Sequence, residues 1–427
     1  MKWLIVLAAL LLAACVSTGD ARDSLDSIAR DYVKLQLAIG EKEEGYIDSY
    51  FGPAQWQAEA KLKPVTLPDL AARAGVLSVR LRSIADSRLD PMERRRRDFL
   101  LAQLRAASTR LRMMQGEKLA FADEAEGLFG VRPELKPLSA YDPVLARIER
   151  LVPGSGPLAG RVGDFQSRFI IPRERLEPVM RAAIAECRRR TLRHIALPAN
   201  ERFTLEFVTG KSWGGYNWYK GDAHSLIQVN TDHPIRISRA VDLGCHEGYP
   251  GHHVYNMLLE QKLAKARGWT EFTLYPLYSP QSFIAEGSAN YGIALAFPGE
   301  ERLRFETAVL YPLAGLPAKD AAAYFRLEEA IQELAGARFT IARDYLEGRI
   351  DRSRAIELAR RYQLISRPRA EQSIAFTEQY RSYVINYGLG LDMVRLAVER
   401  AGANPAARWA AMEKMLSEPT LPKDLGR

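Results

Sequence analysis

Apolar residues recur at spacings of three and four over most of this chain, a pattern typical of α-helices with one buried face. The Arg-, Leu- and Ala-rich stretches 68–86, 91–115 and 172–195 have this pattern, and residues 300–420 return to it. One apolar stripe consists of Leu100, Leu104, Ala107 and Leu111. Prolines separate the stretches, as expected where helices end. The pattern therefore predicts a mainly α fold, a large helical scaffold.

The period changes between residues 202 and 232. Apolar and polar residues alternate over 203–207 and again over 225–230, which predicts two β-strands. Glycines between these runs mark turns. The sequence thus predicts a small β-sheet, followed by a helix that begins near Arg236.

Histidines are concentrated in this predicted helix. The chain has six histidines, and three of them lie in the run HEGYPGHH at 246–253. In the pattern His-Glu-x-x-His, two imidazoles one helical turn apart hold zinc. Here Pro250 stands where the second histidine of that pattern would be. The run therefore predicts a metal site built on a modified helix.

The proline decides which histidines can meet. On a straight helix, at about 100° and 1.5 Å per residue, His252 would lie on the wrong face, and His253 would lie about 10.5 Å along the axis from His246. Pro250 forces a kink or bulge, because its ring clashes with the preceding turn and it lacks an N–H. A bulge of two residues would return His252 to His246. We predict these two as ligands, with His253 as an outer residue or a substitute ligand.

Glu247 has the position of a general base beside the metal. A carboxylate that takes a proton from metal-activated water contributes roughly 10²–10⁴-fold to the rate. Two other interpretations of the run remain open. One is a helix end with clustered polar residues and no metal, and the other is a metal site that only binds.

The run HEGYPGHH, together with AEGSANYG at 285–292, resembles the bacterial domain-of-unknown-function family 885, whose members are similar to zinc metallopeptidases of the gluzincin type. The segment DSYFGPAQW at 48–56 and the tyrosine- and glycine-rich stretch near 380–390 share in the resemblance, which spans most of the chain. It implies a metallopeptidase-like cleft with the small sheet next to the metal-binding helix. It also implies that His246, His252 and Glu286 are the ligands.

Glu286 lies among Ile, Ala and Gly, where a carboxylate is costly to bury without a partner. A metal ion supplies such a partner, although a carboxylate in the first turn of a helix would also be stabilised by the helix dipole. Two neutral imidazoles and one carboxylate leave a fourth position for water, as in catalytic zinc sites. We therefore expect one Zn²⁺ ion, with Asn290 one turn away as an outer partner.

Tyrosines on one helical face are candidates for stabilising the oxyanion. Tyr380, Tyr383 and Tyr387 share such a face, and a hydroxyl on a facing helix can donate to the developing charge. Tyr387 is the first choice and Tyr383 the second. The alternative for this stripe is core packing.

The predicted sheet has a possible role in substrate binding. In the gluzincin-type peptidases that this segment resembles, an edge strand before the metal helix pairs with the extended substrate, and residues 225–230 are the candidate here. The aromatic residues Tyr216, Trp218 and Tyr219 either line the cleft or pack within the hairpin.

The first residues predict export and lipidation. Residues 1–14 have a charged start and a short apolar core, as in signal peptides. Residues 12–15 read LAAC, which matches the bacterial lipobox and predicts cleavage before Cys15 and acylation of that cysteine, palmitate included. Val16 in place of Asp resembles lipoproteins sent to the outer membrane. We expect a protein anchored in the bacterial cell envelope, facing the periplasm; an ordinary secretory signal is the alternative.

The remaining cysteines and the charge add little. Cys187 and Cys245 are either bridged, as an oxidising periplasm would permit, or buried thiols. The formal net charge of +8 is scattered over helix-like segments, which is typical of solvated faces. Basic residues are not interleaved with aromatic ones, so we expect no nucleic-acid partner.

These observations predict an N-terminal helical region at 15–195 and a metal-binding catalytic region at 196–427, with a cleft between the two halves. The favoured function is a membrane-tethered zinc-dependent hydrolase of peptide bonds, which acts on peptides or on the stems of peptidoglycan. The competing hypothesis is a non-catalytic lipoprotein that binds metal or peptide. A closed four-ligand sphere that includes His253 would favour the second hypothesis.

Overall fold

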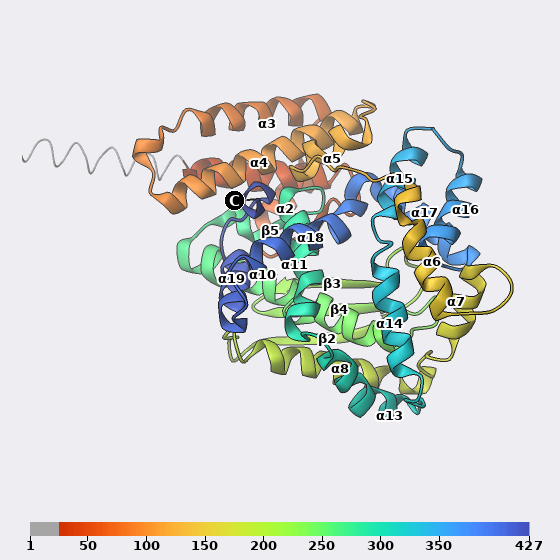
Figure 1. Cartoon of the computed structure of the whole chain (residues 1–427). Coiled ribbons are helices and arrows are strands. Elements are labelled where there is room, and N and C mark those ends of the chain that lie inside the picture. Colours follow the sequence, from red (N-terminus) through yellow and green to blue (C-terminus); the bar gives the residue numbers. More distant parts are fainter. Residues whose placement is uncertain (1–24, 427) are drawn as a thin grey trace, which may run out of the picture.

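The computed structural model describes residues 25–426, so the predicted signal peptide and Cys15 lie outside the described residues. The described chain is mainly helical and contains a small sheet, as the periodicity predicts (Figure 1). The small sheet has three strands, and a second sheet has two. No helix in this part of the chain is long and apolar enough to cross a bilayer.

The N-terminal helices form a layer at the top of Figure 1. This layer contains the helical residues 25–40, α2 (Ala54–Leu62), α3 (Leu67–Arg82), α4 (Pro91–Met114) and α5 (Phe121–Phe129). The apolar stripe predicted on α4 is buried, from Leu100 at 0% exposure to Ala107 at 1%. Asp90 and Glu93 form a capping box at the start of α4, which satisfies backbone N–H groups there.

The three-stranded sheet lies beside the metal-binding segment. Its strands are β2 (Arg202–Val208), β4 (His224–Asn230) and β3 (Gly215–Gly221), in that order, with β4 parallel to β2 and antiparallel to β3. The prediction that 225–230 is an edge strand is therefore wrong, because β4 is paired on both sides. The free edge nearest the predicted site belongs to β3.

A second, two-stranded sheet has no counterpart in the predictions. It pairs β1 (Ile47–Tyr50) antiparallel with β5 (Leu274–Pro276). These strands are far apart in the sequence. The pairing connects the segment that follows the helical residues 25–40 to the segment that precedes α11.

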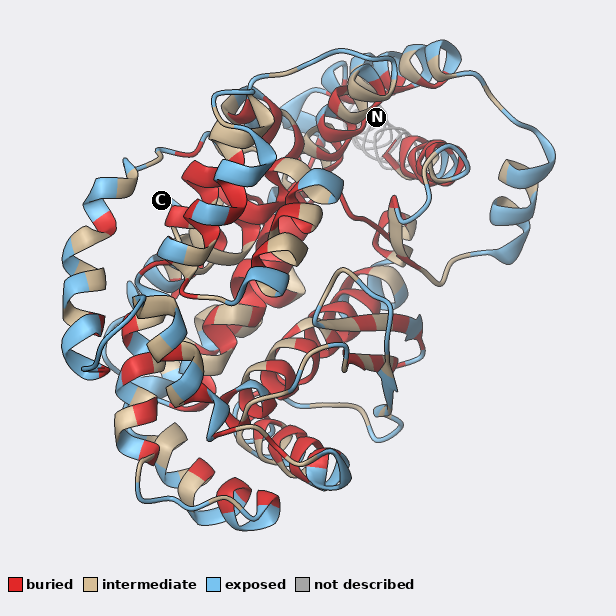
Figure 2. Ribbon diagram, turned by 90° about the vertical axis from the view of Figure 1, so that its right-hand side faces the viewer, coloured by how far each residue is buried: buried red, intermediate tan, exposed pale blue. Residues whose placement is uncertain are grey.

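Two helices cross at the centre of the molecule (Figure 1). They are α11 (Pro280–Ala296) and α18 (Ile385–Glu399). A Cβ atom at Gly287 would lie 2.5 Å from the carbonyl of Gly390, so only glycine permits this approach of the two backbones. Figure 2 shows that buried positions concentrate where such central helices face one another.

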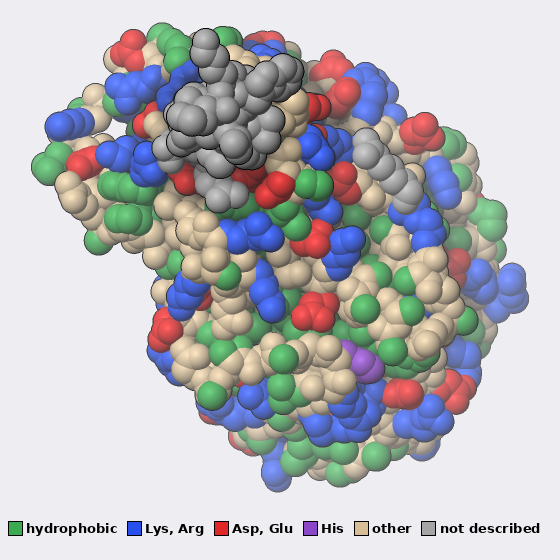
Figure 3. Space-filling view, turned by 90° about the vertical axis from the view of Figure 1, so that its left-hand side faces the viewer, with side chains coloured by type: hydrophobic (Ala, Val, Ile, Leu, Met, Phe, Trp, Pro, Cys, Tyr) green, Lys and Arg blue, Asp and Glu red, His purple; other side chains and the backbone are tan. Residues whose placement is uncertain are grey.

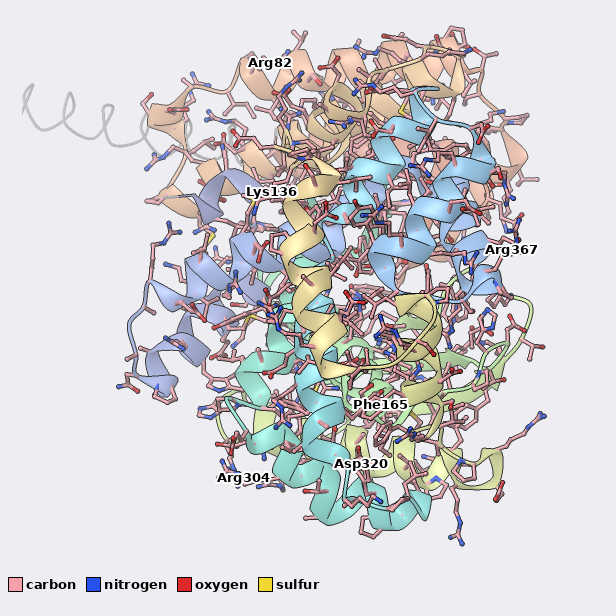
Figure 4. The ribbon with its side chains drawn as sticks, turned by 45° about the vertical axis from the view of Figure 1, so that its right-hand side comes forward. Arg82, Lys136, Phe165, Arg304, Asp320 and Arg367 are labelled. Carbon is pink, nitrogen blue, oxygen red and sulfur yellow. A yellow bond between two sulfur atoms is a disulfide. The ribbon has the colours of Figure 1, made fainter. Side chains whose placement is uncertain are left out.

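Other helices form a second core. Its helices are α6 (Asp142–Leu151), α7 (Leu158–Ser167), α14 (Ala321–Gln332), α15 (Ala337–Leu346), α16 (Arg352–Gln363) and α17 (Arg367–Tyr380). In Figure 4, α6 lies beside α14, with Lys136 and Asp320 marking opposite ends of the pair. Residues 153–157 form the loop between α6 and α7.

The remaining helices complete the larger core or extend its surface. They are α8 (Leu176–Thr191), α9 (Ile237–Leu243), α10 (His252–Leu259), α12 (Glu301–Phe305), α13 (Tyr311–Ala314), α19 (Pro405–Ser417) and α20 (Pro422–Leu425). Basic and acidic side chains are interspersed on the face shown in Figure 3, as expected for solvated helix faces.

Candidate metal centre

The predicted helix that carries the histidines is interrupted around Pro250, as expected for a proline inside a helix. Helix α9 ends at Leu243, a π-helical turn covers Gly244–Gly248, and α10 begins at His252. A cis Tyr249–Pro250 bond lies between them. A Cβ atom at Gly251 would lie 1.8 Å from the carbonyl oxygen of His246, so this close return of the chain requires glycine. The return places His252 beside His246.

A disulfide fixes the same turn from behind. Cys187 on α8 is bonded to Cys245, with their Cα atoms 5.4 Å apart, which decides between the two alternatives left open for these cysteines. Gly244 packs against the backbone of α8 at Ile184. His246 and Glu247, the next two residues after Cys245, are thus carried by an anchored segment.

Three predicted ligands meet at one point. The Nε2 atoms of His246 and His252 lie 3.1 Å apart, and the Glu286 carboxylate lies 3.2 Å from the first and 3.8 Å from the second. All three ligand atoms lie within 4.8 Å of one another, and this is the one such group found in residues 25–426. We call these three residues the ligand triad. Glu286 is well inside α11, not in its first turn.

The triad fits a divalent cation by its chemistry. Nδ1 of His246 donates to Oδ1 of Asn290 at 3.1 Å, while the amide nitrogen of Asn290 donates to the Tyr387 carbonyl, also at 3.1 Å. This arrangement leaves the Nε2 lone pair of His246 directed at the triad. Burial lowers the pKa of His252 to about 4, so its imidazole is neutral. Oε2 of Glu286 is buried and accepts no hydrogen bond from the described chain, which a cation would correct.

Glu247 lies next to the triad with its carboxylate unpaired. The residue is 4% exposed, and its side chain forms no hydrogen bond or ion pair with residues 25–426. Burial raises its pKa to about 7. Gly215 of β3 leaves room for the carboxylate, since a Cβ atom there would lie 2.7 Å from Oε1. A carboxyl group with this pKa can both take and return a proton near neutral pH.

The two predicted tyrosines approach the triad in different ways. The Tyr383 hydroxyl donates to Oε1 of Glu286 at 2.7 Å, so it orients a ligand. The Tyr387 ring stacks toward His246, with centroids 6.4 Å apart, and its hydroxyl has no hydrogen-bond partner in the described chain. Tyr387 is therefore the tyrosine whose hydroxyl remains available for another donor role.

His253 faces away from the triad. Its Nε2 lies 3.1 Å from Oε1 of Glu201, and its Nδ1 lies 2.7 Å from the Ser225 hydroxyl. Glu201 also accepts a hydrogen bond from Tyr249 and pairs with Arg188 at 2.8 Å. We call these five residues the Glu201 network. The structure does not bring His253 to the position of a metal ligand.

The triad opens into a cavity of about 1450 Å³. Tyr216 and Trp218 line it, as considered from the sequence, whereas the Tyr219 hydroxyl donates to Glu260 outside the lining. Asp48 also lines it, accepts a hydrogen bond from Tyr216 and has its pKa raised to about 7 by burial. Asp48 was missed as a site residue, although it belongs to the segment 48–56 on which the family resemblance rests.

Comparison with known proteins gives limited information. No protein-family model and no curated protein matches the chain. Among solved structures, a protein from Colwellia psychrerythraea that is provisionally described as a lipoprotein is similar at 14% identity and a TM-score of 0.49, covering 84% of this chain and 71% of that one. The M32 carboxypeptidase from Deinococcus radiodurans R1 is similar at 12% identity and a TM-score of 0.41, covering 94% and 90%. At these scores neither likeness bears on activity, and membership of family 885 stays a prediction.

Proposed function

We propose that this protein is a zinc-dependent hydrolase of peptide bonds. The observation that carries the proposal is the meeting of His246, His252 and Glu286 beside the unpaired carboxylate of Glu247. When bound, the cation polarises a carbonyl group and acidifies a water molecule. The remaining steps are assigned to side chains of this chain.

Glu247 is proposed to carry the proton. Its carboxylate takes a proton from the attacking water and returns it to the leaving amine. The Tyr387 hydroxyl is proposed to donate to the oxyanion that develops. Tyr383 and Asn290 hold the ligands Glu286 and His246 in place.

The free edge of β3 is proposed to bind the substrate backbone. Gly214 O accepts from Asn230, so by the alternation of antiparallel pairing the backbone groups of Gly215 face away from β4. Gly215 also adjoins the Glu247 carboxylate. An extended peptide paired there would pass the triad without requiring a particular side-chain sequence.

His253 also bears on the choice between catalysis and binding. It is engaged by Glu201 and Ser225, so the triad keeps three ligands and an opening toward the cavity, which supports catalysis over closed metal binding.

Attachment to the cell envelope through acylated Cys15 is part of the proposal. Peptides and peptidoglycan stems share the bond that is cleaved.

The test replaces Glu247 with glutamine. We expect Glu247→Gln to keep its zinc and to lose roughly 10²–10⁴-fold in kcat on a mixed-peptide library, because only the proton carrier is removed. Metal content by mass spectrometry and amine release with and without chelator would be measured together. Glu329→Gln, at an exposed residue on the same cavity, is the matched control. Full activity of Glu247→Gln with zinc retained would exclude the proposed mechanism.

A further inference from the structure

Arg338, on the cavity wall, lacks an acidic partner; Arg369 on the same wall also forms no ion pair within residues 25–426, but it donates to the Pro234 carbonyl at 3.1 Å. Arg338 lies on α15, is half-buried and lines the same cavity as the triad. Its Nε is buried and donates to no acceptor, and its guanidinium forms no ion pair within residues 25–426. Burial lowers its pKa, and no carboxylate of the described chain offsets that effect. Such an uncompensated cation costs free energy in the unliganded protein.

Arg96 and Arg302, two arginines with little exposed surface, differ from Arg338 in having carboxylate partners. Nε of Arg96 lies 2.6 Å from the Glu271 carboxylate, and Arg302 pairs with two carboxylates at 2.8 Å each. These pairs serve the fold, since both partners belong to the chain. The contrast suggests that the anion for Arg338 comes from outside the chain.

The position of Arg338 connects it to the candidate centre through aromatic rings. Its guanidinium carbon lies 4.8 Å from the centre of the Phe376 ring, and that ring lies 6.2 Å from Tyr387. Tyr387 in turn lies 6.4 Å from His246. The Phe339 ring holds α15 against α18, because it fills the space that a side chain at Gly388 would occupy. Arg338 is therefore fixed relative to the triad.

We propose that Arg338 binds a carboxylate of the substrate and so selects peptides that carry this group near the bond to be cleaved. The assigned source is the free C-terminus, which the planar guanidinium can bind with two parallel hydrogen bonds. Cleavage then adds water across the preceding peptide bond and releases a short acidic product. This inference rests on the proposed hydrolase function for its consequence, but binding at Arg338 can be measured separately.

The test compares matched substrates. Mixed N-acetylated tetrapeptide libraries with a free or an amidated C-terminus are given to the zinc-loaded wild type, Arg338→Gln and Arg338→Lys. We expect Arg338→Gln to lose roughly 10- to 100-fold in kcat/KM on the free-acid library and little on the amide library, because a charge-assisted contact is lost. Arg338→Lys is expected to retain part of the preference, since it keeps the charge without the fork. Arg395→Gln, at a cavity residue already paired with Asp392, is the control.

Two further amidated libraries, with Glu or Gln fixed next to the last position, separate a side-chain carboxylate from the C-terminus. A preference that appears only with Glu would overturn the assignment to the C-terminus. Equal losses on acid and amide libraries, or no acid preference in the wild type, would overturn the proposal for Arg338. If no library is cleaved, calorimetric binding of the acid and amide libraries still decides on Arg338, while the hydrolase proposal fails. Thermal unfolding of each variant identifies losses caused by misfolding, in which case the wild-type preference and Arg338→Lys decide.

Discussion

Adjacent histidines of one short segment belong to two polar groups of opposite character. In the ligand triad, Nε2 of His252 lies 3.1 Å from Nε2 of His246. Oε2 of Glu286 accepts no hydrogen bond from the described residues. In the Glu201 network, His253 is fully buried and has a partner at each ring nitrogen. A buried polar group whose hydrogen-bond partners all belong to the chain stabilises the fold. A buried polar group beside a cavity that lacks such partners indicates a bound ligand.

The comparison is tested most strongly by exchanging the two histidines for alanine in turn. We expect His252→Ala to lower zinc affinity by more than roughly 100-fold and to retain the fold, because it removes a direct ligand. Loss of a residue that only orients a ligand lowers metal affinity by about 10- to 100-fold. His253→Ala should keep zinc and lose about 1–3 kcal/mol of unfolding free energy, because Glu201 loses a buried donor. Metal titration and urea unfolding of both variants give the result. Equal metal loss in both would abolish the distinction between the groups.

Acid should weaken the Glu201 network in a defined window. Burial alone would raise the pKa of Glu201, but hydrogen bonds from His253 and Tyr249 outweigh it and lower the pKa to about 2. A lowered folded-state pKa adds stability above the ordinary value, near pH 4.5, that disappears as the pH falls toward 2. The full contribution is about 3 kcal/mol.

The measurement is urea unfolding between pH 7 and pH 2.5 in the presence of chelator, so that metal release does not contribute. Glu201→Gln should show a shallower fall in unfolding free energy with acid than the wild type. Parallel curves for the two proteins would show that the network does not hold this carboxylate ionised.

The smallest expected effect concerns the hydrogen bond that orients His246 in the triad. Asn290→Ala removes the acceptor that fixes the His246 tautomer, so zinc affinity should fall roughly 10- to 100-fold. Asn256→Ala is the matched control, because within residues 25–426 Asn256 donates only to the backbone carbonyl of His252. Zinc competition with a chromophoric chelator measures both. The tautomer argument fails if the two variants bind zinc alike.

Local patterns predicted much of the fold. Helical spacing located the buried face of α4, and alternation located β2 and β4. The deformation around Pro250 followed from backbone chemistry, since proline cannot continue the helix and Gly251 permits the close return. For this reason the approach of His252 to His246 was accessible from the sequence.

Long-range pairing was not accessible in the same way. The central place of β4 and the pairing of β1 with β5 depend on contacts between distant segments, about which local alternation says nothing. Which of two adjacent histidines turns away from the triad depends on partners such as Glu201, far away in the sequence. The sequence does not distinguish Arg338 from other charged residues on helix surfaces. Only the three-dimensional arrangement shows that Arg338 forms no ion pair within residues 25–426.

The bond between Cys187 and Cys245 fastens the turn that carries His246 and Glu247. Thiols are kept reduced in the cytosol, whereas oxidising compartments let such bonds form and persist. We expect the reduced chain to take up zinc more weakly, which zinc titration of reduced and oxidised protein would show. Under the proposed function and export, a newly synthesised chain would bind zinc weakly in the cytosol and would gain hydrolase activity only after export, when oxidation forms the disulfide.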